Sequence, residues 1–213
     1  MNKYRLKFEK QGYMRFIGHL DTLSLFQRCV KLAKIPIAYS QGFNPHQIMY
    51  FALPLSLGMA SFGEYLDIQL SAPMEPNDIG HSLNGFLPQG IKISSGRILR
   101  EKEKYAPKIV TGAIYTAQVN TTQEEITTLL EKDEILVNKK TKKGEYPANI
   151  RPLIYNLTLK DNTLNMTIAA GNNNLKPGLI TNILNQNHVQ FTRLDILATK
   201  EDGLTFENLW EYK

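Results

Sequence analysis

Cysteine is nearly absent from this chain: Cys29 is the only one among 213 residues. A single cysteine excludes an internal disulfide framework, and it excludes a zinc or iron–sulfur site built from several cysteines of this chain alone. Long apolar runs are also missing, since none approaches the roughly 18 residues that a membrane span needs. The first residues lack the apolar segment of a signal peptide, so we expect a cytoplasmic protein with no membrane partner.

Charge is only mildly unbalanced, and the net charge of +5 comes entirely from the first half of the chain. Residues 1–106 carry 13 Lys and Arg against 8 Asp and Glu, whereas residues 107–213 carry 12 of each. A modest basic excess favours a polyanionic partner over an acidic one. Neither a Gly-x-Gly-x-x-Gly string nor a Walker loop is present, so nothing indicates nucleotide-dependent chemistry.

The apolar pattern of the first half predicts the order strand, helix, strand, strand, helix, strand. The predicted strands cover 4–10, a short one at 36–40, 64–70 and 91–98, with an extra strand or loop near residue 50 within 48–53, and the predicted helices cover 19–34 and 76–87. A charged stretch containing Pro107 follows, and its composition is typical of a linker.

The second half repeats this order without obvious sequence identity. Strands are predicted over 111–119, 153–159, 164–168 and 189–197, and a short one over 135–138. One helix starts at the capping box of Thr122 and Glu125 and another at Pro177, while Asp161-Asn162 forms a hairpin turn. We therefore predict an α+β fold of two tandem ferredoxin-like (split β-α-β) domains, residues 1–106 and 107–213.

The densest group of polar side chains lies between Tyr39 and His46. Gly42 permits a positive φ angle and Pro45 pushes Asn44 out of the helical region, so this loop should be stiff. Carboxamides and rings suit unpaired RNA bases, which are read by edge hydrogen bonds and stacking. Alternatively, Ser40 and Asn44 only hold the turn by bonding to the backbone. The candidate recognition residues are Tyr39, Ser40, Gln41, Asn44 and His46.

A second group, Arg15 to Asp21, lies where the first predicted helix begins. Free N–H groups at a helix start, beside Arg15, favour an anion site; alternatively, Asp21 complements the helix dipole and His19 is a local cap. His19 and His46 also allow an acid–base pair, because imidazoles titrate near neutral pH. No metal-ligand spacing is present. Further phosphate contacts are predicted for Arg97, Lys139, Lys140, Lys142, Lys143 and Arg151.

Several strings resemble one bacterial family. They are Arg15-Phe16-Ile17-Gly18-His19-Leu20-Asp21, Ser40-Gln41-Gly42-Phe43-Asn44-Pro45-His46, Leu53-Pro54-Leu55, Glu64-Tyr65-Leu66-Asp67, Ile150-Arg151-Pro152 and Lys176-Pro177. In these strings the chain is similar to the radical SAM-associated family, a domain of unknown function found alone or fused behind a radical S-adenosylmethionine enzyme. The resemblance implies a helper of such an enzyme, with the iron–sulfur cluster and S-adenosylmethionine held by the partner and no cofactor in this chain.

The residues and the resemblance together lead us to expect a non-catalytic recognition module. It would bind RNA, or a ribosomal or RNA-bound substrate, and present it to a radical S-adenosylmethionine enzyme. One alternative is a metal-independent endoribonuclease that uses His19 and His46. The other is a purely structural partner of the radical enzyme, in which the loop residues form a protein interface.

Overall fold

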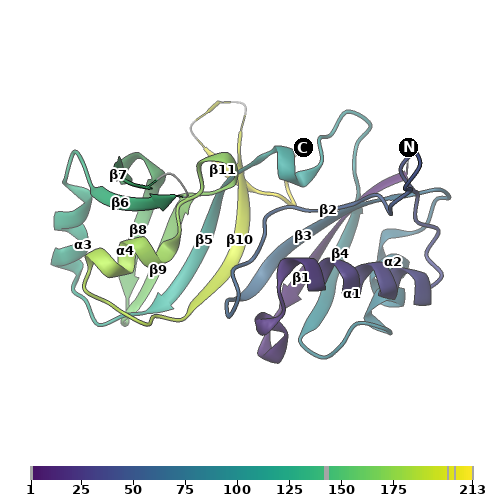
Figure 1. Ribbon diagram of the computed structural model, residues 1–213, viewed down its shortest axis with the longest axis horizontal. Coiled ribbons are helices and arrows are strands. Elements are labelled where there is room, and N and C mark those ends of the chain that lie inside the picture. The colour runs from purple at the N-terminus through teal and green to yellow at the C-terminus, as the bar shows by residue number, and fades with distance from the viewer. Residues whose placement is uncertain (1, 142–143, 201, 204, 213) are drawn as a thin grey trace. The chain divides into compact units, whose positions relative to one another are not determined.

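The structure is a computed structural model that describes residues 2–141, 144–200, 202–203 and 205–212. It contains both helices and β-sheet, as predicted (Figure 1). The chain divides into two compact units. The first comprises the described residues up to Val110 together with those from Asp195 onward, and the second comprises Thr111–Leu194. The C-terminal segment thus belongs with the first unit, whereas the sequence pattern assigned it to the second domain.

The first unit follows the predicted order of strands and helices. Its main elements are β1 (Asn2–Lys10), α1 (His19–Leu32), β2 (Met49–Phe51), β3 (Ala60–Leu70), α2 (Pro76–Asn84) and β4 (Ile91–Ile98). Three short elements accompany them: the 3-10 helices η1 (Gly12–Phe16) and η2 (Ala106–Lys108), and the strand β11 (Phe206–Asn208).

All the strand pairs among β1 to β4 are antiparallel. β1 pairs with both β3 and β4, and Ile68 of β3 faces Tyr4 of β1 on one side and Met49 of β2 on the other. The order is therefore β4-β1-β3-β2. The strand predicted at 36–40 is wrong: this segment makes only isolated bridges, Ile37 to Leu70 and Tyr39 to Gln47. Pro36 at its start has no N–H to extend the ladder.

Helices α1 and α2 cover one face of this sheet (Figure 1). Leu6 and Phe8 alternate along β1 toward that face, and Phe26 of α1 and Ile79 and Leu83 of α2 pack with them in one core. Each of the five is at most 1% exposed. Burying one such side chain contributes about 1.5–3 kcal/mol, so these five side chains are a major source of the unit's apolar stabilisation.

The opposite face of β1 and β3 is also buried around Arg5 and Asp67, which the predicted half-buried strand did not anticipate. Arg5 is 0% exposed, and its Nε and Nη2 donate to the two carboxylate oxygens of Asp67 at 2.8 and 2.9 Å. Arg5 also donates to the carbonyl of Leu209 at 2.9 Å, and Asp67 accepts the N–H of Ala106 at 2.6 Å. These bonds hold the stretch predicted to be a linker, and the C-terminal segment, against the sheet.

Glu103 extends this buried ion network. It accepts hydrogen bonds from Arg97 at 2.9 and 2.5 Å and from Arg5 at 3.3 Å. Burial acts to raise the pKa of the Glu103 carboxyl. The hydrogen bonds from Arg97 and from the N–H of Arg100, with the charges of Arg97 and Arg5, outweigh burial, so the pKa of Glu103 lies below its ordinary value.

This lowered pKa predicts a contribution of Glu103 to acid sensitivity. A carboxyl whose pKa is lower in the folded chain stabilises the fold above its ordinary pKa, and that contribution disappears as the pH falls through the folded value. We expect the free energy of unfolding to fall below about pH 4.5 more steeply in the wild type than in Glu103→Gln. Urea unfolding between pH 7 and pH 3 measures both slopes, and equal slopes would contradict the assignment.

The second unit contains β5 (Val110–Gln118) from its second residue onward, α3 (Gln123–Leu130), β6 (Leu136–Thr141), β7 (Gly144–Asn149), β8 (Ile154–Lys160), β9 (Thr163–Ala169), α4 (Pro177–Ile183) and the start of β10 (Phe191–Thr199). Short 3-10 helices lie at η3 (Arg151–Leu153) and η4 (Gly171–Asn173). The strand order is β10-β5-β9-β8, and β6 and β7 pair with each other as a separate two-stranded sheet.

Local sequence signals in the second unit are confirmed. Thr122 and Glu125 form the predicted capping box at the start of α3. Asp161 and Asn162 both have positive φ, 49° and 58°, as a two-residue type I′ hairpin turn requires. The β6–β7 pairing was not predicted beyond a short strand. No helix in the described parts of either unit is long and apolar enough to span a membrane.

Candidate functional site

Ser40 and His46 close the loop that the sequence singled out. The N–H of Ser40 donates to the carbonyl of His46 at 2.8 Å, and Ser40 Oγ accepts the N–H of His46 at 3.1 Å. Ser40 Oγ also lies 2.8 Å from His46 Nδ1. Gly42 has a φ of 123°, a conformation that favours glycine. The loop therefore has a fixed base, and Ser40 does serve the turn, as the alternative interpretation expected.

The tip of this loop extends into solvent. Phe43 has a relative exposure of 109%, and Gln41 and Asn44 are exposed beside it. The side chains of Gln41 and Asn44 make no hydrogen bond within the described chain, so Asn44 does not hold the turn through its carboxamide. Phe43 was not among the predicted recognition residues. The sequence did offer one signal for its exposure: Phe43 directly follows Gly42, the residue expected to take a positive φ at the tip of the turn.

Arg15 lies on η1, just before α1. Its guanidinium carbon is 4.7 Å from the ring centroid of Phe16, and its Nε is buried without a partner. Among the described residues, no acceptor binds this guanidinium, whereas its backbone carbonyl accepts the N–H of Gly58 at 2.8 Å. A guanidinium held on an aromatic ring with its donors unused suits a phosphate or carboxylate ligand.

The buried side chain of Lys10 holds the backbone between η1 and α1 in place through hydrogen bonds. It is only 3% exposed, and its Nζ donates to the carbonyl of Ile17 at 2.7 Å and lies 3.2 Å from Thr22 Oγ1. Thr22 Oγ1 in turn donates to the carbonyl of Gly18 at 2.8 Å. Sequence reasoning missed Lys10, although its inward position in the alternating pattern of β1 marks it as unusual.

The two candidate catalytic histidines have different neighbours. The ring of His19 packs edge-on against Phe51 with centroids 5.6 Å apart, whereas His46 bonds to Ser40. No hydrogen bond or ring contact joins His19 to His46 in the part of the chain that the structure describes. An acid–base pair must reach one phosphate from two sides, so this geometry gives the endoribonuclease alternative no support. The described residues also contain no group of three or more His, Cys, Asp and Glu side chains that could hold a metal ion.

Two of the remaining predicted phosphate contacts, Arg97 and Arg151, have internal hydrogen-bond partners. Arg97 donates to Glu103 and to the carbonyl of Tyr212 at 3.0 Å. Arg151 donates to the carbonyls of Leu130 and Ile154 at 3.1 and 3.2 Å. We leave both arginines out of the proposed surface because each already donates at least two hydrogen bonds to internal acceptors, although Arg97 Nε itself has no partner. Lys139 and Lys140 lie on β6 rather than in a loop, and Lys142 and Lys143 lie outside the described residues.

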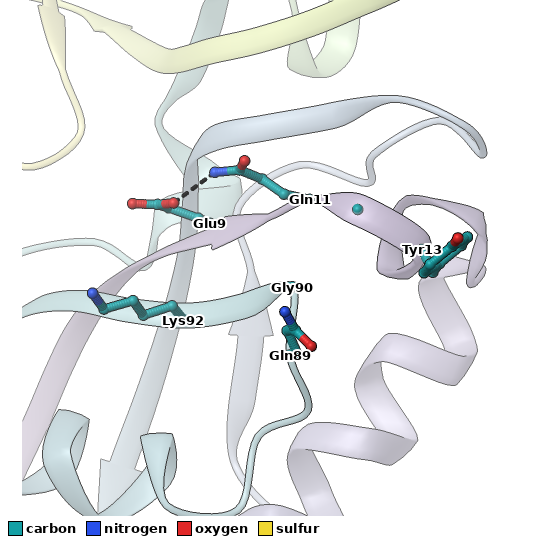
Figure 2. A pocket seen from close by; sticks show the side chains of 7 residues that line it. Glu9, Gln11, Tyr13, Gln89, Gly90 and Lys92 are labelled. Atoms are coloured by element: carbon teal, nitrogen blue, oxygen red, sulfur yellow. Dashed lines mark hydrogen bonds between the residues drawn. The ribbon is translucent and has the colours of Figure 1, made fainter.

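A pocket of about 480 Å³ opens where β1 meets η1 (Figure 2). It is lined by Glu9, Gln11, Gly12, Tyr13, Gln89, Gly90 and Lys92. Glu9 faces Lys92 in the β1–β4 register, and Gln11 Nε2 donates to Glu9 Oε2 at 2.6 Å. Gly90 has a φ of 99°, and a Cβ there would lie 2.6 Å from the carbonyl oxygen of Gln11, so the pocket floor requires glycine. Sequence reasoning missed this pocket, because its residues meet only through the strand register.

Most of the chain matches one bacterial protein family. The match covers residues 3–177, and the family is described as "Uncharacterized protein conserved in bacteria (DUF2344)". The matched range contains the 39–46 loop, Arg15 and the pocket. No curated protein matches the chain.

Proposed function

The chain belongs to the DUF2344 family of bacteria, and from that premise we propose that it is a non-catalytic recognition module that binds RNA or an RNA-associated substrate for a radical S-adenosylmethionine enzyme. The observation that supports RNA most is the tip of the 39–46 loop. There a fully exposed Phe43 ring stands between two carboxamides, Gln41 and Asn44, that have no internal partner. Stacking of a base on an aromatic ring contributes about 1–3 kcal/mol, and carboxamides can bind the base edge.

The 3-10 helix η1 supplies further contacts of the same kind. Side chains three positions apart in a 3-10 helix lie above one another, which places Tyr13 and Phe16 on one face of η1. Tyr13 is 93% and Phe16 is 54% exposed. Arg15, between them in sequence, offers an unpaired guanidinium for a phosphate. Proteins that bind single-stranded nucleic acid combine aromatic rings, on which the bases stack, with cationic side chains that contact the phosphates.

The fold and the partner enzyme are parts of the same proposal. We propose that each unit is ferredoxin-like, and the strand orders β4-β1-β3-β2 and β10-β5-β9-β8 support this. The radical S-adenosylmethionine enzyme as partner, and the cytoplasm as location, rest on the sequence alone. A chain that binds the radical enzyme but no RNA would mean that the loop is a protein interface, and the RNA part of the proposal would be wrong.

Gln41→Ala tests the role of the loop. We expect this variant to bind a single-stranded RNA oligonucleotide about tenfold more weakly, because one base contact is worth about 1–3 kcal/mol. Its melting temperature should stay unchanged, since an exposed side chain without internal bonds contributes less than about 0.5 kcal/mol to stability. Fluorescence anisotropy measures the affinity and calorimetry the melting temperature. Gln123→Ala, at an exposed glutamine of α3, is the control and should bind RNA like the wild type. A Gln41→Ala protein that melts earlier but keeps its RNA affinity would assign the loop a structural role.

A further inference from the structure

We infer that the pocket lined by Glu9, Tyr13 and Lys92 binds one unpaired nucleotide whose base carries an exocyclic amino group. The inference rests on the proposed function, because it names a base-specific site within the proposed RNA-binding unit. It adds a preference between bases, which the exposed loop tip alone does not imply.

The pocket has the size and layout for a nucleotide. Its volume of about 480 Å³ lies in the usual range of about 300–1,000 Å³ for small-molecule sites. Figure 2 shows Glu9 and Lys92 toward one end of the pocket and Tyr13 toward the other. Leu6 and Phe8 point to the helices, so Glu9, at the next position of β1, points to the opposite face of the sheet. The charged end is therefore separate from the apolar core.

Both charges at that end are available to a ligand. Glu9 and Lys92 face each other in register, yet no ion pair joins them. Glu9 Oε2 accepts the bond from Gln11, while Glu9 Oε1 and the ammonium of Lys92 have no hydrogen-bond partner among the residues that the structure describes. A ligand that satisfies both groups must offer a hydrogen-bond donor to the carboxylate and an anion to the ammonium.

The other end adds a flat apolar surface. The ring of Tyr13 is 93% exposed, and an exposed ring on the rim of a pocket is suited to stacking. A nucleotide combines a planar base, a donor amino group and a phosphate in one molecule. Glutamate accepts a hydrogen bond from the amino group of cytosine, whereas uracil presents a carbonyl oxygen at the same position and would be repelled. The geometry thus favours amino-bearing bases over uracil.

Cytidine and uridine oligonucleotides give the sharpest test, because the two bases differ only at C4, which bears an amino group in cytosine and a carbonyl oxygen in uracil, and in the proton that uracil carries on N3. We expect the wild-type chain to bind oligo(C) about tenfold more tightly than oligo(U) of the same length. Glu9→Gln should reduce that preference to less than about twofold, because an amide offers both a donor and an acceptor. Lys92→Gln should weaken the binding of both oligonucleotides alike. It should also reduce the slope of log K against log salt concentration by the contribution of about one phosphate contact. Glu75→Gln and Lys31→Gln, at exposed positions of the same unit, are the matched controls.

The outcomes separate this inference from the proposed function. If both oligonucleotides bind equally, or if Glu9→Gln keeps the preference while Gln41→Ala loses affinity, the pocket inference is wrong and the proposed function stands. If neither oligonucleotide binds, the proposed function fails, and titration of CMP and UMP followed by NMR decides the pocket. Shifts at Tyr13 and Lys92 with CMP that Glu9→Gln abolishes would support a nucleotide site, and their absence would overturn it.

Discussion

Replacing Asp67 with alanine is expected to lower the free energy of unfolding by about 3–5 kcal/mol, the usual cost of breaking a buried ion pair from one side. The carboxylate is fully buried and accepts two hydrogen bonds from Arg5 and one from the N–H of Ala106. Without it, the guanidinium of Arg5 stays in the interior with only part of its charge compensated. The segments that bond to Arg5, including the backbone of Leu209, should then be held less tightly.

Urea unfolding followed by circular dichroism measures this loss. Asp133→Ala, at an exposed aspartate, is the control and should change stability by less than about 0.5 kcal/mol. Should Asp67→Ala fail to fold, Asp67→Asn keeps the shape and one acceptor while it removes the charge, and we expect an intermediate loss. A stability of Asp67→Ala within about 1 kcal/mol of the wild type would contradict the role of the network.

The largest functional effect is expected from changing Arg15 and Phe43 together. Removing the Phe43 ring loses one stacking contact of about 1–3 kcal/mol, and Arg15→Gln loses one phosphate contact. No contact joins the two side chains among the described residues, so their effects should add. We expect Arg15→Gln with Phe43→Ala to bind single-stranded RNA about a hundredfold more weakly, which corresponds to about 2.7 kcal/mol.

Affinity measured by fluorescence anisotropy tests this expectation. The matched control combines Arg28→Gln with Phe86→Ala, an exposed arginine and a half-exposed phenylalanine of the same unit. That control should bind RNA within about twofold of the wild type. If the control and the test variant lose the same affinity, binding depends on general charge and the loop is not the recognition site.

Elements set by local sequence could be predicted. The capping box at Thr122 and Glu125 and the turn at Asp161-Asn162 involve residues close in sequence, and both are present. The buried face of β1 could not be predicted, because strand alternation indicates which side chains share a face but not what covers that face. Arg5 bonds to a carbonyl 204 residues away, and this contact depends on the path of the C-terminal segment.

In the candidate site, too, the features set by neighbouring residues could be predicted and those set by long-range packing could not. The stiffness of the 39–46 loop follows from Gly42 and its neighbours, so the sequence indicated it. Whether His19 and His46 meet depends on the packing of α1 and β2, which no spacing reveals. Arg97 was assigned to phosphate because it is basic, yet its partner Glu103 lies across a turn after β4. The pocket at Glu9 and Lys92 arises from the register of β1 and β4, and register is not readable from either strand alone.

The most direct test of RNA recognition is the salt dependence of oligonucleotide binding by the whole chain. Each phosphate contact to a single strand should contribute about −0.7 to the slope of log K against log salt concentration. We predict a linear fall in affinity for the wild type, a slope reduced by about one such contact in Arg15→Gln, and an unchanged slope with lower affinity in Phe43→Ala. A wild-type slope near zero, or slopes and affinities that neither substitution alters, would contradict the proposal that this chain recognises RNA.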